Sequence, residues 1–182
     1  MKLHRDTLIT QLVEQTKTNL NQVQILKELD DKQLNFKNST ESWSVLECIK
    51  HLNIYGDFYI PAIEKSIEDA SNSDNETFKT GVIGNYFVKL IEPKEKLNNM
   101  KTMSQFNPLG SNLNRDELTK FEQHQYQLLT LLSKASKVNL TTNKTGTSIS
   151  KLINMRLGDT LRFVIAHNER HLNQANRIVA DF

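Results

Sequence analysis

The sequence has little cysteine, proline and glycine. Its 182 residues include one Cys, three Pro and six Gly. A fold built from many short strands needs a turn roughly every eight to twelve residues, so this shortage argues against an all-β protein and favours long helices. The single Cys48 has no intramolecular disulfide partner, which agrees with a reducing compartment. We therefore expect an all-α protein without a disulfide framework.

An excess of one charge sign and a long apolar run are also missing. Lys and Arg number 23, Asp and Glu number 21, and the net charge is +2. The isoelectric point of about 8.6 and the interspersed charges differ from nucleic-acid-binding domains, which usually have a basic cluster. No stretch is long and apolar enough for a spanning helix or a secretory signal. These absences predict a cytoplasmic protein that binds neither nucleic acid nor membrane.

Hydrophobic periodicity predicts the first two helices. Residues 8–29 place apolar side chains at alternating spacings of three and four, which is typical of an amphipathic helix. The polar residues 30–42 have no such period and are expected to form a loop. Ser44 and Glu47 then form a capping-box pattern that begins a second helix. Pro61 should kink or reset this helix, because proline lacks the backbone donor that the helix requires.

Two further helices are predicted in the second half. Asn114 is the expected N-cap of a helix ending near residue 137, and a strongly periodic segment follows Gly158 up to Ile178. Residues 72–113 between the second and third helices form a long crossover, in which 80–93 suit a short helix. With 182 residues and no internal repeat, the chain is predicted to be a single domain, residues 1–182, with an all-α four-helix-bundle fold.

Two histidines on the last predicted helix are candidate metal ligands. His167 and His171 differ by about 40° in direction and about 6 Å along a helix axis, so one metal ion can reach both rings. His171 lies on the apolar stripe, where an imidazole needs partners for both ring nitrogens. A bound metal meets that need, and so does an ordinary hydrogen-bonded core histidine.

A third nitrogen ligand has to come from another helix. His51 on the second helix is the first candidate, with Glu47 one turn earlier as a possible acceptor for its ring. His124 on the third helix is the alternative. His4 is expected to be exposed near the charged N-terminus.

Two separated motifs resemble a known family. Trp43-Ser44, Glu47 and His51-Leu52 are similar to the W-S-x-x-E-x-x-x-H-L signature of the DinB-like superfamily, a group of metal-binding four-helix bundles. Residues 167–174, with the sequence HNERHLNQ, resemble that family's H-x-x-R-H-L-x-Q motif. Residues 100–108 are similar to a connecting segment of one branch.

The resemblance implies a DinB-like bundle with a triad of His51, His167 and His171. Such a triad holds a divalent metal ion, typically zinc or nickel, with positions open for water or substrate. Relatives are described as metal-dependent hydrolases or as transferases that attach a low-molecular-weight thiol to an electrophile. The implied partners are a small-molecule substrate and a thiol cofactor.

Three neutral imidazoles would leave a divalent ion its full charge, so it would be a strong Lewis acid. Such an ion can activate water for hydrolysis, or it can deprotonate a thiol. Hydrolysis calls for a carboxylate base, for which Glu47 and Glu169 are nearest in sequence, although Glu169 should face away. The sequence assigns no catalytic residue.

The remaining residues near these motifs have ordinary structural interpretations. Gln174 could orient a histidine ring or make an interhelical hydrogen bond, and Arg170 should pair with an acid on a neighbouring helix. Trp43 is expected to pack at the helix entry. The apolar stripe also contains Tyr55, Tyr59 and Cys48, which are expected to be core residues.

Two other functions stay open at this point. The chain can be a non-enzymatic metal-binding or interaction module, including a homodimer formed through a helix face. A fourth protein ligand such as His124 would close the metal site and indicate a structural metal, whereas an open cavity beside the metal would indicate an enzyme. A plain helical bundle with three core histidines is the third interpretation.

Overall fold

The computed structural model describes residues 1–92, 102–150 and 152–182. It is predominantly helical, which confirms the all-α prediction. The helices are α1 (Arg5–Lys27), α2 (Asp31–Asn35), α3 (Val45–Glu68), α4 (Val82–Ile91), α5 (Asp116–Ala135) and α6 (Leu157–Ala180), with a 3-10 turn η1 (Ser104–Phe106). None of the helices in these described ranges is long and apolar enough to cross a membrane.

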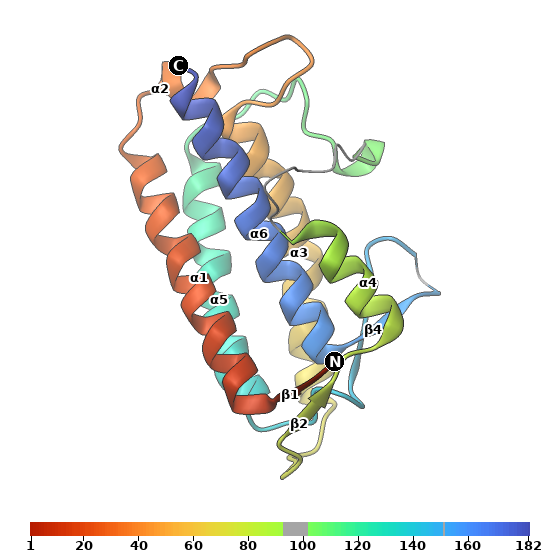
Figure 1. The fold of residues 1–182 in the computed structure, drawn as a ribbon. Coiled ribbons are helices and arrows are strands. Elements are labelled where there is room, and N and C mark those ends of the chain that lie inside the picture. The colour runs from red at the N-terminus through yellow and green to blue at the C-terminus, as the bar shows by residue number, and fades with distance from the viewer. Residues whose placement is uncertain (93–101, 151) are drawn as a thin grey trace.

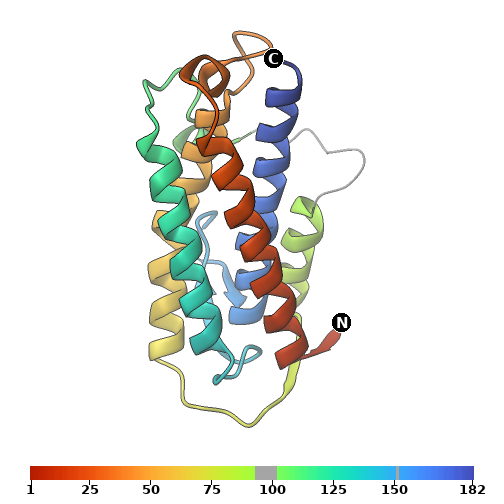
Figure 2. The same cartoon turned by 90° about the vertical axis from the view of Figure 1, so that its left-hand side faces the viewer.

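The four long helices α1, α3, α5 and α6 lie side by side (Figures 1 and 2). The helix α3 packs against α5 and α6, and α1 packs against the same two helices. The shorter α4 lies on the outer side of α6, next to its N-terminal half (Figure 1). The segment between α3 and α5 therefore adds a helix to the outside of the α6 layer.

Two helix starts can be compared with their predicted caps. The capping box of α3 is confirmed, since the Glu47 backbone N–H donates to Ser44 Oγ at 3.2 Å and the Ser44 N–H donates to Glu47 Oε2 at 2.9 Å. The cap predicted for α5 is wrong by one residue, because the N-cap is Arg115. Asn114 Oδ1 instead accepts from the Asp116 N–H at 2.9 Å.

The reset of the second helix predicted at Pro61 is wrong, because α3 continues through this residue from Val45 to Glu68.

Several short elements were not predicted. The expected loop 30–42 contains α2, which begins with a capping box between Asp30 and Gln33. Two antiparallel strand pairs join distant segments: β1 (Lys2–His4) with β2 (Thr77–Lys79), and β3 (Lys144–Gly146) with β4 (Asn154–Arg156). In contrast to these elements, the short helix α4 was predicted, within residues 80–93. Residues 93–101 of the predicted crossover lie outside the described residues.

The core consists of two apolar clusters, one toward each end of the long helices. On α6, the first cluster takes residues from Leu157 to Ala166 and the second takes residues from Leu172 to Ile178. His167 and His171 lie between them. Buried polar side chains occupy the same level of the other helices, including Asn19 on α1 and Gln125 on α5. The candidate metal ligands are thus at the boundary between the two clusters.

Candidate metal centre

Three histidines from two helices meet at this boundary. His51 comes from α3, and His167 and His171 come from α6. Their exposed fractions are 2%, 6% and 9%. One ring nitrogen of each lies within 4.8 Å of the other two, an arrangement that could hold a metal ion. The long-range partner of the α6 pair is therefore His51.

Hydrogen bonds fix the orientation of two of the rings. His51 Nδ1 lies 2.7 Å from the carbonyl oxygen of Phe106, and His171 Nδ1 lies 2.9 Å from Gln174 Oε1. Because both partners are oxygen acceptors, each Nδ1 carries the proton in the neutral ring and each Nε2 keeps its lone pair. An outer acceptor of this kind is typical of metal-bound histidine.

The spacing of the ring nitrogens suits a bound cation. His51 Nε2 lies 3.3 Å from His167 Nε2. Two nitrogens bound to one tetrahedral zinc at about 2.0–2.1 Å would be separated by about 3.3–3.4 Å. The buried Nδ1 of His167 makes no hydrogen bond within the described ranges. The donor set, its spacing and its burial therefore fit a divalent ion.

The three imidazoles are held in their neutral form. Burial lowers the pKa of His51 from 6.5 to about 4, although its hydrogen bond to Phe106 acts in the opposite direction. The pKa of His171 falls to about 3, first through burial and then through the nearby His51. Burial also lowers the pKa of His167 well below its usual value. Near neutral pH all three lone pairs are available to a metal, because none has to be deprotonated first.

Glu47 connects the segments that surround the site. Its Oε1 accepts from Lys37 Nζ and from the Gly110 backbone N–H, both at 2.6 Å, while its Oε2 belongs to the capping box with Ser44. Gly110 has a φ of 78°, in the region that favours glycine. Among the described residues, Glu47 makes no hydrogen bond to His51, and the carbonyl of Phe106 is the acceptor for the His51 ring. Glu47 therefore ties the loops on either side of the site to the start of α3.

Aromatic side chains cover the histidines. The ring of Trp43 lies 4.9 Å from that of His51 and 5.7 Å from that of His171, and Trp43 Nε1 donates to Asn107 Oδ1 at 3.1 Å. Tyr55 lies 4.3 Å from the ring of His167. Both residues were expected to be packing residues only, but they also line the pocket beside the histidines. Tyr59 is fully buried, as expected.

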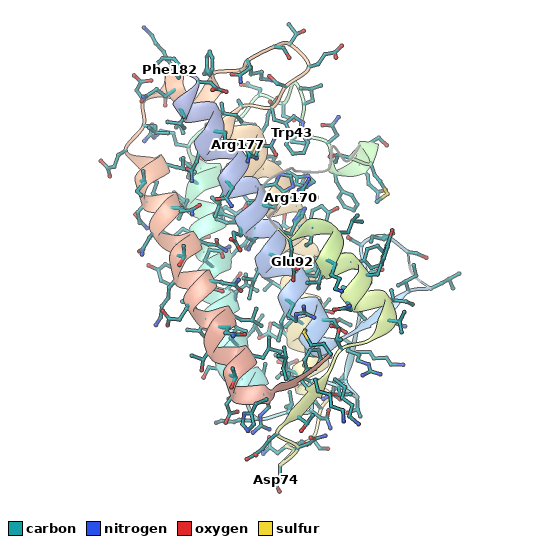
Figure 3. The ribbon with its side chains drawn as sticks, viewed as in Figure 1. Trp43, Asp74, Glu92, Arg170, Arg177 and Phe182 are labelled. Carbon is teal, nitrogen blue, oxygen red and sulfur yellow. The ribbon has the colours of Figure 1, made fainter. Side chains whose placement is uncertain are left out.

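The histidines line an open pocket of about 860 Å³. Its other lining residues come from α3, α4 and α6, from the loop before α3, from the segments on either side of η1 and from the loop between β3 and β4. Figure 3 labels Trp43, Arg170 and Arg177, which lie along this side of α6. The pocket has the size of a small-molecule site, and its walls combine aromatic and aliphatic groups with a few polar ones.

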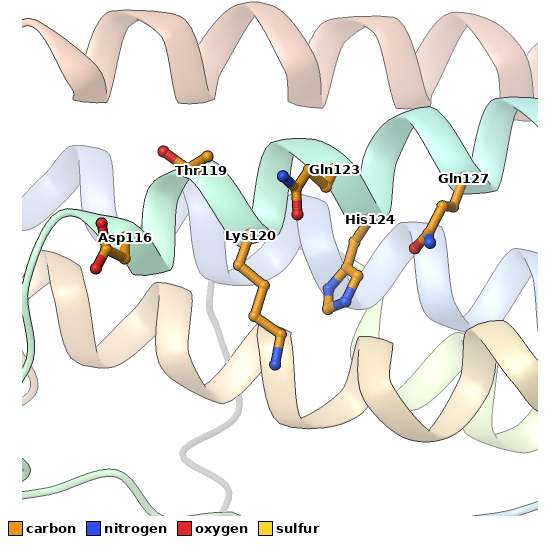
Figure 4. A pocket seen from close by; sticks show the side chains of 6 residues that line it. All are labelled: Asp116, Thr119, Lys120, Gln123, His124 and Gln127. Atoms are coloured by element: carbon orange, nitrogen blue, oxygen red, sulfur yellow. The ribbon is translucent and has the colours of Figure 1, made fainter.

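His124 lies away from this centre. Its Nε2 is 3.4 Å from Asp57 Oδ1, and it lines a separate shallow pocket on α5, where it points toward α3 beside Lys120 (Figure 4). Glu169 does not line the histidine pocket, and burial followed by the charge of Glu92 raises its pKa. Cys48 is fully buried, and burial raises its pKa. Among the described residues, the metal cluster contains the three histidines and no carboxylate or thiol.

Some residues of the site could not be found from the sequence. The Phe106 carbonyl, which holds His51, belongs to a segment without periodicity, and a backbone oxygen has no residue-type signature. Phe87 and Leu90 of α4 reach the pocket only because α4 packs on α6. A short helix was expected within residues 80–93, but no sequence signal indicated that it would form a wall of this pocket.

The chain was compared with known proteins. The model of the DinB superfamily matches residues 13–175, a range that contains all three histidines. No curated protein and no solved structure matches the chain.

Proposed function

We propose that this chain, which belongs to the DinB superfamily, is a metal-dependent enzyme acting on a small molecule through His51, His167 and His171. The observation that carries the proposal is the position of three neutral histidines in the wall of an open pocket. Within the described residues no fourth protein ligand closes the cluster. Catalytic metal sites have this form, with protein ligands on one side and space on the other.

The helical arrangement supports a DinB-like four-helix bundle. In this architecture α1, α3, α5 and α6 are the four members, and residues 69–115 form the long crossover between the second and third. The packing of α3 and of α1 against both α5 and α6 supports it. The crossover then supplies two walls of the pocket, from α4 and from the loop around η1.

We propose thiol transfer as the reaction, with metal-dependent hydrolysis as the alternative. A bound divalent ion would act as a Lewis acid, which deprotonates a coordinating thiol without a protein base. Hydrolysis by a general base needs a carboxylate beside the reacting water. Glu47 is bound by Lys37, Gly110 and Ser44, and Glu169 does not line the pocket. Neither carboxylate is therefore placed to act as the general base for hydrolysis, which favours thiol transfer.

The protein groups would hold the reactants and exclude water. In a substitution, the thiol sulfur forms a bond to the electrophilic carbon, the leaving group departs with the electron pair of its bond, and the thiol proton passes to solvent. Trp43 and Tyr55 cover the histidines and limit the access of water. The Tyr55 hydroxyl, whose pKa burial raises to about 12, stays protonated near neutral pH and can therefore donate a hydrogen bond to a ligand as well as accept one.

Elemental analysis of tag-free protein tests the metal proposal. We expect close to one zinc or nickel ion per chain in the wild type and almost none in His51→Ala and His171→Ala. His124→Ala is the matched control and should keep its metal, because His124 contacts Asp57 instead.

Activity is tested with the metal-loaded protein. Chlorodinitrobenzene with N-acetylcysteine tests thiol transfer, and nitrophenyl acetate tests hydrolysis. We expect metal-dependent thiol transfer that His51→Ala removes. Hydrolysis without thiol transfer would favour the alternative, and equal metal content in wild type and His51→Ala would refute the histidine site.

A further inference from the structure

The pocket is divided by the histidines into two parts of different chemistry. Along α6, its lining runs from Phe163 through the histidines and Gln174 to Arg177 and Asp181. At about 1.5 Å per residue, Phe163 starts about 6 Å before His167, and Arg177 lies about 9 Å beyond His171. The histidines thus lie between two ends of one groove.

The end near Phe163 is apolar, and we call it the apolar arm. It is lined by Tyr55, Phe87, Leu90, Ile91, Ile149 and Phe163. The ring of Phe163 is parallel to that of His167 at 5.8 Å, and Phe87 lies 6.5 Å from Phe163. This arm therefore continues from the histidine ring into an aromatic and aliphatic wall, which binds apolar groups by removing them from water.

The opposite end carries the guanidinium group of Arg177, and we call it the arginine arm; Arg170 lines the pocket at the level of the histidines. Arg170 and Arg177 are seven residues apart on α6, so they point in nearly the same direction, two turns apart (Figure 3). The charge of Arg177 contributes to lowering the pKa of Arg170, after burial. The positive charge of Arg177 therefore acts on Arg170, at the level of the histidines.

Nothing in the described parts of the chain forms a hydrogen bond or an ion pair with the Arg177 guanidinium. Two carboxylates, Glu41 and Asp181, line the same end. Asp181 Oδ2 accepts instead from Asn38 Nδ2 at 2.7 Å. A guanidinium fork without a carboxylate partner is suited to a carboxylate supplied by a ligand. The two carboxylates already present argue for a ligand with one negative charge, because they would repel a dianion.

We infer that the ligand of this pocket is an amphipathic monocarboxylate that spans the histidines, with its carboxylate at Arg177 and its apolar group in the apolar arm. The inference rests on the proposed function in one respect, the metal ion held between the two arms. The apolar arm and the arginine arm are present whether or not a metal is bound. It assigns Arg177 and Phe87 as residues that determine specificity.

Three related thioethers test this inference by calorimetric titration of the zinc-loaded protein. The first, hexylsulfanylpropanoate, has both the apolar chain and the carboxylate. Its amide removes the charge, and methylsulfanylpropanoate removes the chain. We expect the full compound to bind at least about tenfold more tightly than either of the other two.

Variants identify the responsible groups. Arg177→Gln should bring the affinities of the acid and the amide to within about twofold, and Arg177→Lys should keep part of the difference. Phe87→Ala should weaken the hexyl compounds and leave the preference for acid over amide unchanged. Lys17→Gln is the control, because Lys17 pairs with Glu14 on the exposed face of α1.

Metal analysis of each protein separates the two proposals. A normal metal content without discrimination between acid and amide would overturn the inference and leave the metal site intact. A preference for the acid that persists in Arg177→Gln would also overturn it. Discrimination in a protein that binds no metal would support the two arms and refute the proposed function.

Discussion

The metal-free protein is expected to lose stability in mild acid, because its core holds neutral histidines. Burial lowers the pKa of His51 from 6.5 to about 4 and that of His171 from 6.5 to about 3. Below pH 6.5 both rings take up protons in the unfolded chain but stay neutral in the folded protein. The unfolded state then binds more protons, so the free energy of unfolding falls as the pH decreases toward the lowered pKa values.

The expected loss follows from proton linkage. For His51, lowering the pH from about 7 to about 4.5 should reduce the free energy of unfolding by about 2 kcal/mol. His171 should add a reduction of about the same size. This is a large part of the stability of a single domain, which is typically about 5–15 kcal/mol.

Urea unfolding followed by far-ultraviolet circular dichroism measures this loss at both pH values. The proteins are metal-free wild type, His51→Gln and the control Gln11→Ala. Carboxylates that titrate in the same range are common to all three, so the difference between variants isolates one histidine. The loss in His51→Gln should be about 2 kcal/mol smaller than in the wild type.

Gln11→Ala should decline as the wild type does, because the side chain of Gln11 is exposed on α1 and does not ionise. Equal losses in wild type and His51→Gln would refute the reasoning. They would mean that His51 takes up a proton as easily in the folded protein as in the unfolded chain.

Three further predictions concern packing and the segments around the site. Gly158→Ala should lower the free energy of unfolding by about 1–3 kcal/mol in thermal unfolding, because an added Cβ would lie 2.5 Å from the Phe78 ring. Adding Phe78→Leu to this variant should recover part of the loss. An unchanged stability of Gly158→Ala would contradict the close packing of Gly158 against Phe78. Glu47→Ala should cost about 3 kcal/mol, since it leaves Lys37 and the Gly110 N–H without their acceptor; an unchanged melting temperature would refute this role. Cys48 should react with a thiol reagent only after unfolding, because burial raises its pKa; equally fast labelling in the native protein and in urea would contradict its burial.

The sequence determined the long helices and the pairing of two ligands. Apolar spacings of three and four predicted α1, α3, α5 and α6 because the period of a helix is a local property. The same local geometry brings His167 and His171 to one face of α6. The α3 capping box was readable for a similar reason, since Ser44 and Glu47 are three residues apart and bond to each other's backbone.

The resemblance to family motifs predicted the third metal ligand, which periodicity could not. Periodicity could not decide between His51 and His124, because both lie on amphipathic helices. The resemblance to the DinB-like motifs favoured His51, and the structure places it against His167. The short strand pairs and α2 escaped prediction, since each is a few residues long and depends on distant contacts, such as Leu3 opposite Phe78.

Only the tertiary structure decided what surrounds the histidines. The Phe106 carbonyl reaches His51 from 55 positions away, and Glu47 bonds the Gly110 N–H across 63 positions. The two arms of the pocket arise because α4 packs on α6 and the loops fold over the start of α3. Local sequence fixes which way a side chain points on its own helix. Which group it meets depends on how the helices and loops pack, and that is set by contacts over the whole chain.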